Sequence, residues 1–76
     1  MEIAPHITID ADVHHGTPVI AGTRFPVAIA IGSLAGGMSK AEVMAEYELT
    51  QEQLEAALSY ATDLVTATAV SPLVGA

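Results

Sequence analysis

The chain has 76 residues, no cysteine and a net charge of −7 at pH 7. This length fits one small domain, and the missing cysteines exclude disulfides and thiolate metal sites. Only two basic residues, Arg24 and Lys40, stand against nine carboxylates. Because Lys and Arg contacts to phosphate supply most nucleic-acid affinity, this charge disfavours DNA binding by the isolated protein and favours a basic protein partner.

The hydrophobic share of 51% is large for so small a domain. Much of it is alanine, but the rest exceeds what a globule of this size readily buries. We therefore expect a homodimer or a higher oligomer. Polar residues interrupt every stretch of about 18 residues that could span a membrane. The first residues also lack the basic and apolar regions of a signal peptide. We expect a cytoplasmic protein that makes no membrane contact.

Residues 3–25 predict a short β element with a tight loop. Ile3, Ile7 and Ile9 mark an extended opening that ends at the polar residues 10–12. The segments that follow are expected to form a turn, a strand, a second turn and a returning strand, at residues 14–18, 19–20, 21–23 and 24–25. So small a β element needs helices to pack against.

The most constrained stretch is residues 16–27, which read Gly-Thr-Pro-Val-Ile-Ala-Gly-Thr-Arg-Phe-Pro-Val. Glycine permits positive φ, whereas proline fixes φ and removes a hydrogen-bond donor. This pattern indicates a structural corner or a recognition loop, and it argues against a flexible linker.

Residues 26–70 predict three helices. Pro26 suits the first position of the first helix, since its missing N–H would be unpaired there. That helix is expected to end at Gly36 and Gly37, which can form a left-handed C-terminal cap. Ser39 and Glu42 form a capping box that begins a second helix, which extends to about residue 47.

A second capping box, formed by Thr50 and Gln53, begins the third and longest helix. Apolar residues at helical spacing follow from Leu54 onward, and the helix is expected to end at residues 71–72, Ser-Pro. Residues 71–76 would then be a flexible tail. The expected core consists of Ile20, Phe25, Val27, Ile31, Leu34, Val43, Tyr47, Leu54, Leu58 and Ala61.

These elements predict a mainly α fold. A three-helix core over residues 26–70, similar to a helix-turn-helix domain, follows the short β element. The whole chain is then a single domain of residues 1–76.

The stretch at residues 16–27 resembles domain of unknown function family 433, small bacterial proteins described as antitoxin-like. Further matching stretches are residues 34–39, 42–43, 46–47, 49–50 and 56–61. The resemblance implies a homeodomain-like core that is commonly dimeric. For some members it also implies a neighbouring toxin, similar to PIN-type ribonucleases, that they neutralise. Thr17 stands where the family usually has lysine, and His15 where an acidic residue often precedes the glycine. The lost positive charge weakens a nucleic-acid interpretation.

Arg24 is the first candidate functional residue. Its guanidinium could contact phosphate or an acidic groove of a partner, because it forms bidentate pairs with such groups. Alternatively, it pairs with Asp10 or Asp12, or bonds the carbonyls of its own turn. We expect the structural role.

Acidic residues lie along the second and third predicted helices and the turn between them, at Glu42, Glu46, Glu48, Glu52 and Glu55. They could be ordinary solvated helix faces, or they could match the basic RNA-binding groove of a toxin. Glu52 and Glu55 are the candidate partner contacts. In a DNA-binding alternative, Gln51 and Gln53 would begin the recognition helix, with Lys40 nearby.

No catalytic or metal-binding constellation is evident. The histidines His6, His14 and His15 do not follow a known ligand spacing, and no serine has a marked base beside it. We therefore expect a non-enzymatic protein-binding module without cofactors. The family resemblance implies that this module is antitoxin-like and masks a PIN-like ribonuclease. The alternatives are a helix-turn-helix DNA-binding regulator and a purely structural assembly protein.

Overall fold

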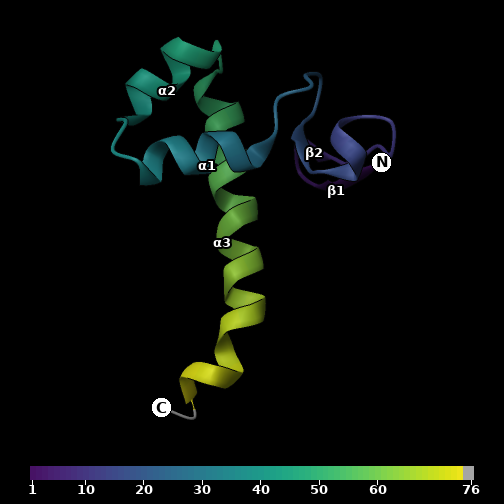
Figure 1. Ribbon diagram of the computed structural model, residues 1–76, viewed down its shortest axis with the longest axis vertical. Helices are drawn as coiled ribbons and strands as arrows, with labels where there is room; N and C mark the ends of the chain where they lie inside the picture. The colour runs from purple at the N-terminus through teal and green to yellow at the C-terminus, as the bar shows by residue number, and fades with distance from the viewer. Residues whose placement is uncertain (75–76) are drawn as a thin grey trace.

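The computed structural model describes residues 1–74, with side chains through residue 67. Within these residues, a small N-terminal sheet is followed by three helices, so the predicted mainly α fold is confirmed (Figure 1). The strands are β1 (Glu2–Ala4), β2 (Ile7–Thr8) and β3 (Val19–Ile20). The helices are α1 (Val27–Ala35), α2 (Lys40–Tyr47) and α3 (Gln51–Val74).

The sheet is antiparallel, in the order β1-β2-β3. Ile7 pairs with Ile20, and both side chains are fully buried. The predicted extended opening is therefore two strands, because the chain reverses at residues 5–6. His6 adopts a positive φ of 62° there, and its N–H donates to Glu2 Oε2 at 2.9 Å.

A tight corner connects β3 to α1. Gly22 permits the turn with a φ of 80°, and the Thr23 hydroxyl donates to the Ile20 carbonyl at 2.7 Å. The Ile20 N–H donates to the Phe25 carbonyl at 3.0 Å, and the Val27 N–H donates to the Pro18 carbonyl at the same distance. These hydrogen bonds fix the direction in which α1 leaves the sheet.

Two predictions at this corner need correction. Residues 24–25 do not form a returning strand, since only an isolated bridge between Val19 and Pro26 is present. Pro26 lies just before α1 rather than at its first position, with an extended ψ of 134°. The reason is that Pro26 takes part in the antiparallel bridge to Val19, which requires extended backbone, so helical geometry begins only at Val27.

The predicted helix ends and starts depend on local hydrogen bonds. At the end of α1 only Gly37 is left-handed, with a φ of 110°. The Gly37 N–H donates to Leu34 and the Met38 N–H to Ser33, both at 3.1 Å, which is a Schellman motif. Gly36 keeps right-handed geometry.

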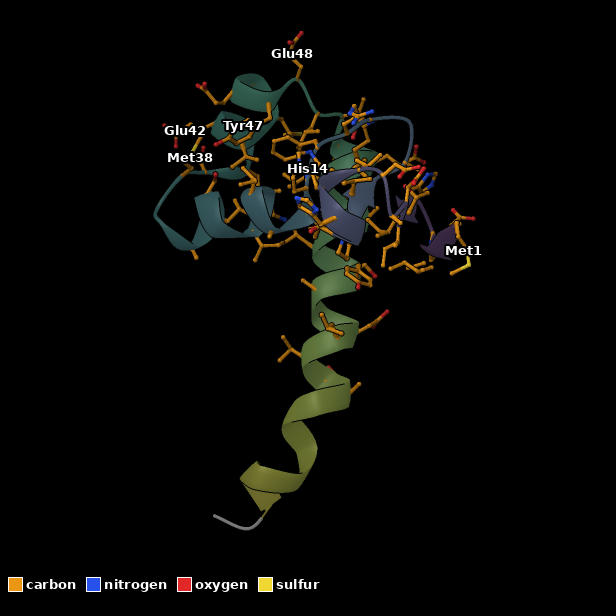
Figure 2. All side chains as sticks on the ribbon, turned by 45° about the vertical axis from the view of Figure 1, so that its right-hand side comes forward. Met1, His14, Met38, Glu42, Tyr47 and Glu48 are labelled. Atoms are coloured by element: carbon orange, nitrogen blue, oxygen red, sulfur yellow. The ribbon has the colours of Figure 1, made fainter. Side chains whose placement is uncertain are left out.

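Both predicted capping boxes are confirmed. Glu42 accepts the Ser39 N–H at 2.7 Å and donates its own N–H to the Ser39 hydroxyl at 3.1 Å. Gln53 and Thr50 make the equivalent pair at 2.9 and 3.1 Å. Between the boxes, Glu48 ends α2 in the left-handed conformation, and Figure 2 shows its side chain pointing away from the body.

The helix α3 extends through Val74, past the predicted end at residues 71–72. A proline removes one backbone hydrogen bond, but helical geometry can continue past it. The predicted flexible tail is therefore helical at residues 71–74, and its residues 75–76 lie outside the described residues. Figure 1 shows the second half of α3 projecting beyond the rest of the molecule.

The core lies where the sheet meets the three helices. Four of the expected core residues are buried, namely Ile20, Val27, Val43 and Leu54. The others are partly buried: Phe25, Ile31, Leu34, Tyr47, Leu58 and Ala61. Buried residues outside that expectation are Ile7, Val19, Ala30, Leu49 and Ala57.

Tyr47 connects α2 to the rest of the core. Its ring lies 4.7 Å from the Phe25 ring, centroid to centroid, and its hydroxyl lies 3.0 Å from the Ser33 hydroxyl. The polar end of this partly buried ring is therefore satisfied inside the protein.

The α2 capping box makes stability depend on pH. The Ser39 backbone N–H and then its side chain lower the pKa of Glu42 below its ordinary value of 4.5. Because the folded-state pKa is the lower one, this stabilisation is present above pH 4.5 and is lost as pH falls through the folded-state pKa. Glu42→Gln keeps an acceptor oxygen but cannot titrate.

We therefore expect Glu42→Gln to lower the melting temperature at about pH 7, and we expect the difference from wild type to shrink towards about pH 3. Thermal unfolding followed by circular dichroism measures this. A difference that stays constant with pH would contradict the assignment.

Candidate functional site

Three carboxylates of α3 line one hollow of about 300 Å³. Glu52, Glu55 and Asp63 share a helix face, because residues three, four or eight positions apart lie near one another around a helix. The opposite wall is the turn between β1 and β2. We call this the acidic hollow; its other lining residues are Ala4, Pro5, His6, Ala56, Ser59 and Tyr60.

The electrostatics of the acidic hollow are one-sided. Neither of the two basic residues of the sequence, Arg24 and Lys40, lines it. Glu55 accepts a hydrogen bond from the Gln51 side chain at 3.0 Å. Glu52 lies in the first turn of α3, where the helix dipole stabilises a negative charge. An open, anionic hollow of this kind suits the guanidinium or ammonium group of a partner.

The hollow brings together both candidate partner contacts on α3, Glu52 and Glu55, and adds Asp63. Sequence reasoning missed Asp63 as a site residue. The available signal was its spacing of eight and eleven residues from the two glutamates, which returns to the same helix face. The β1–β2 turn could not be paired with this face without the tertiary structure.

Arg24 lies apart from the acidic hollow, on the exposed side of the corner before α1. Among the described residues its guanidinium makes no ion pair and no hydrogen bond, so the expected structural pairing is wrong. Asp10 instead accepts the Asp12 N–H at 2.8 Å, which closes a local turn. The Arg24 carbonyl oxygen lies 2.8 Å from Nε2 of His14.

The three histidines lie in turns, where their backbone adopts an uncommon conformation. His6, His14 and His15 all have positive φ, of 62°, 49° and 56°, a conformation uncommon outside glycine. In the part of the chain that the structure describes, no three His, Asp or Glu side chains are grouped to hold a metal ion.

The candidate DNA contacts lie at the start of α2 and α3. Lys40 and Gln51 are exposed, whereas Gln53 is half-buried. The Gln53 side chain is held by the Thr50 N–H, and that of Gln51 by Glu55. Both glutamine side chains thus make hydrogen bonds at the start of α3, which leaves Lys40 as the candidate without such a bond in the described residues.

A family model described as protein of unknown function (DUF433) matches residues 7–61. The chain belongs to the DUF433 family. The match begins at β2 and continues into α3, so it includes the corner before α1 and both capping boxes. No curated protein and no solved structure matches the chain.

The helices α1, α2 and α3 were also compared with the requirements of a membrane-spanning helix. None of the helices in the described residues combines the length and the apolar character that crossing a bilayer requires.

At the corner of this DUF433 protein, substitution can separate the role of the Arg24 guanidinium from that of the Arg24 carbonyl, which His14 contacts. Arg24→Ala is expected to change the free energy of unfolding by less than about 0.5 kcal/mol, as for a surface residue without partners. His14→Asn tolerates positive φ but is too short to reach the Arg24 carbonyl, and should destabilise by about 1 kcal/mol.

Urea denaturation followed by circular dichroism compares the two variants. Equal destabilisation by both substitutions would show that the Arg24 guanidinium supports the fold.

Proposed function

We propose that this DUF433 protein is a non-enzymatic, antitoxin-like binding module that masks a basic PIN-like ribonuclease. The observation that carries the proposal is the acidic hollow, where Glu52, Glu55 and Asp63 line one open surface. The chain as a whole has the same sign of charge, with a net charge of −7.

A ribonuclease binds its substrate through basic side chains, because RNA carries a phosphate on every nucleotide. Carboxylates in a hollow can take the place of these phosphates and form charge-assisted hydrogen bonds with Arg and Lys. Long-range attraction between opposite net charges also speeds the encounter. A partner bound in this way would have its substrate groove occupied.

The hydroxyl groups favour binding over nucleophilic catalysis. The Ser39 hydroxyl caps α2, and that of Ser33 lies at hydrogen-bond distance from Tyr47. The Thr62 hydroxyl donates to the Leu58 carbonyl at 2.9 Å. Each of these groups serves the fold, whereas a nucleophile needs a base beside it.

The test is inhibition of RNA cleavage by a purified PIN-like ribonuclease encoded beside this protein. Glu52→Gln/Glu55→Gln removes two charges from the acidic hollow. The matched control, Glu46→Gln/Glu48→Gln, removes two exposed charges from the end of α2, outside the hollow. Both double variants change the net charge equally.

We expect the hollow variant to weaken inhibition at least about 10-fold, because interfacial charge pairs couple strongly. The control should change it by less than about 3-fold, because rim charges act mainly on the association rate. Rising salt should weaken the wild-type complex. Equal effects of both variants, or inhibition that ignores salt, would contradict the proposal.

One observation favours a DNA-binding regulator as the second candidate. Residues 48–50 join α2 and α3 by a turn of the length found in helix-turn-helix domains. The net charge and the engaged glutamines oppose this function for the isolated protein. In a mobility-shift assay with the DNA upstream of its own gene, we expect no complex at low salt. Tight binding would reverse the ranking.

A further inference from the structure

A second hollow lies beside the acidic hollow on α3. It has a volume of about 280 Å³, lies between α1, α3 and the loop before β3, and is lined by no charged side chain. The hydroxyl of Thr17, in that loop, donates to the His14 carbonyl at 2.6 Å and is thus satisfied within the loop. We call this the apolar hollow; its walls include Pro18, Ala28, Ile31, Tyr60, Ala61 and Leu64.

Tyr60 joins the two hollows, because it lines both of them. On a helix, the residues three and four positions further on are a residue's neighbours along the same face. For Tyr60 these neighbours are Asp63, which lines the acidic hollow, and Leu64, which lines the apolar hollow. The surface is therefore continuous, and it changes from anionic to apolar across this one ring.

The Tyr60 side chain has the character of a binding residue. It is half-buried and packs against the core. Within the part of the chain that the structure describes, its hydroxyl makes no hydrogen bond, whereas the hydroxyl of Tyr47 lies 3.0 Å from that of Ser33. A packed aromatic ring with an available polar end is typical of binding surfaces, where tyrosine is enriched.

Charge and exposure decide what can cover both hollows. Leu64 is 52% exposed and Ala28 is exposed as well, and neither Arg24 nor Lys40 lines either hollow. A purely basic segment would bring a charge against the apolar hollow, where it has no partner. A purely apolar segment would cover the carboxylates without a counter-charge. The surface therefore matches a segment that carries a cation beside an apolar side chain.

We propose that the two hollows bind one segment of the basic partner, which places an arginine in the acidic hollow and a neighbouring apolar side chain, such as leucine, in the apolar hollow. Arginine suits the first position, because its guanidinium pairs with carboxylates and stacks on an aromatic ring such as that of Tyr60. The apolar side chain covers Leu64 and sets the register of the segment. This inference rests on the proposed function, since it assigns the docking segment of the ribonuclease.

The first experiment measures the dissociation constant of the complex with the purified PIN-like ribonuclease. Leu64→Gln has a side chain of similar size but buries an amide without a hydrogen-bond partner, so it should raise the dissociation constant at least about 10-fold. The matched control is Val65→Gln, at the next position of α3, which is 61% exposed and lines neither hollow. The control should change the constant by less than about 2-fold.

Sodium chloride separates the apolar contact from the charged one. Leu64→Gln should weaken binding by the same factor at low and at high salt, because salt screens charges and leaves apolar contacts in place. Asp63→Asn, its neighbour on the anionic side, should weaken binding and also reduce the salt dependence, because one charge pair is lost.

Photo-cross-linking tests whether one segment fills both hollows. The photoreactive residue benzoylphenylalanine is placed either at Ser59, in the acidic hollow, or at Leu64, in the apolar hollow. These positions are separated by about 7.5 Å along the helix axis. We therefore expect both cross-links to lie within about eight residues of each other in the ribonuclease, in a segment with an arginine close to an apolar residue.

The two proposals fail in different ways. A ribonuclease that the wild-type chain does not bind removes the proposed function, and this inference with it. Three results overturn the inference alone. The first is binding that Leu64→Gln leaves unchanged, measured on a variant with the circular dichroism of wild type. The second is an equal effect of Leu64→Gln and Val65→Gln, and the third is cross-links in two distant segments of the ribonuclease.

Discussion

The corner between β3 and α1 is the constraint on which the rest of the structure depends. The Val27 N–H is bound by the Pro18 carbonyl and the Ile20 N–H by that of Phe25. These bonds hold the buried Ile20 and Val27 in one cluster and fix the direction of α1. The direction of α1 in turn determines how α3 packs across the sheet. The acidic hollow, which lies between α3 and the β1–β2 turn, follows from that packing.

Features decided by neighbours in sequence could be predicted, and features decided by distant contacts could not. The capping boxes of Ser39 and Thr50 depend on partners three residues away, so their patterns predict them directly. The burial of Ala30 and Ala57 depends on how closely α1 and α3 approach, which alanine permits but does not signal. Asp63 belongs to the acidic hollow only because the β1–β2 turn lies opposite it. Arg24 was expected to pair locally, for example with Asp10, but Asp10 instead accepts the Asp12 N–H.

The helix α3 divides its chemistry between the core and the acidic hollow. Leu54 and Ala57 are buried in the core, whereas Glu52, Glu55 and Asp63 line the hollow. At 100° per residue the two sets point about half a turn apart. The carboxylates can therefore be exchanged for neutral side chains without disturbing the core contacts of the same helix.

The central claim is that the acidic hollow occupies the RNA-binding groove of a basic ribonuclease. Competition between this chain and a labelled RNA for the same PIN-like ribonuclease, followed by fluorescence anisotropy, tests it most directly. The account predicts that the chain displaces the RNA, because the carboxylates and the phosphates bind the same basic side chains. RNA that stays bound while the chain is also bound would contradict it.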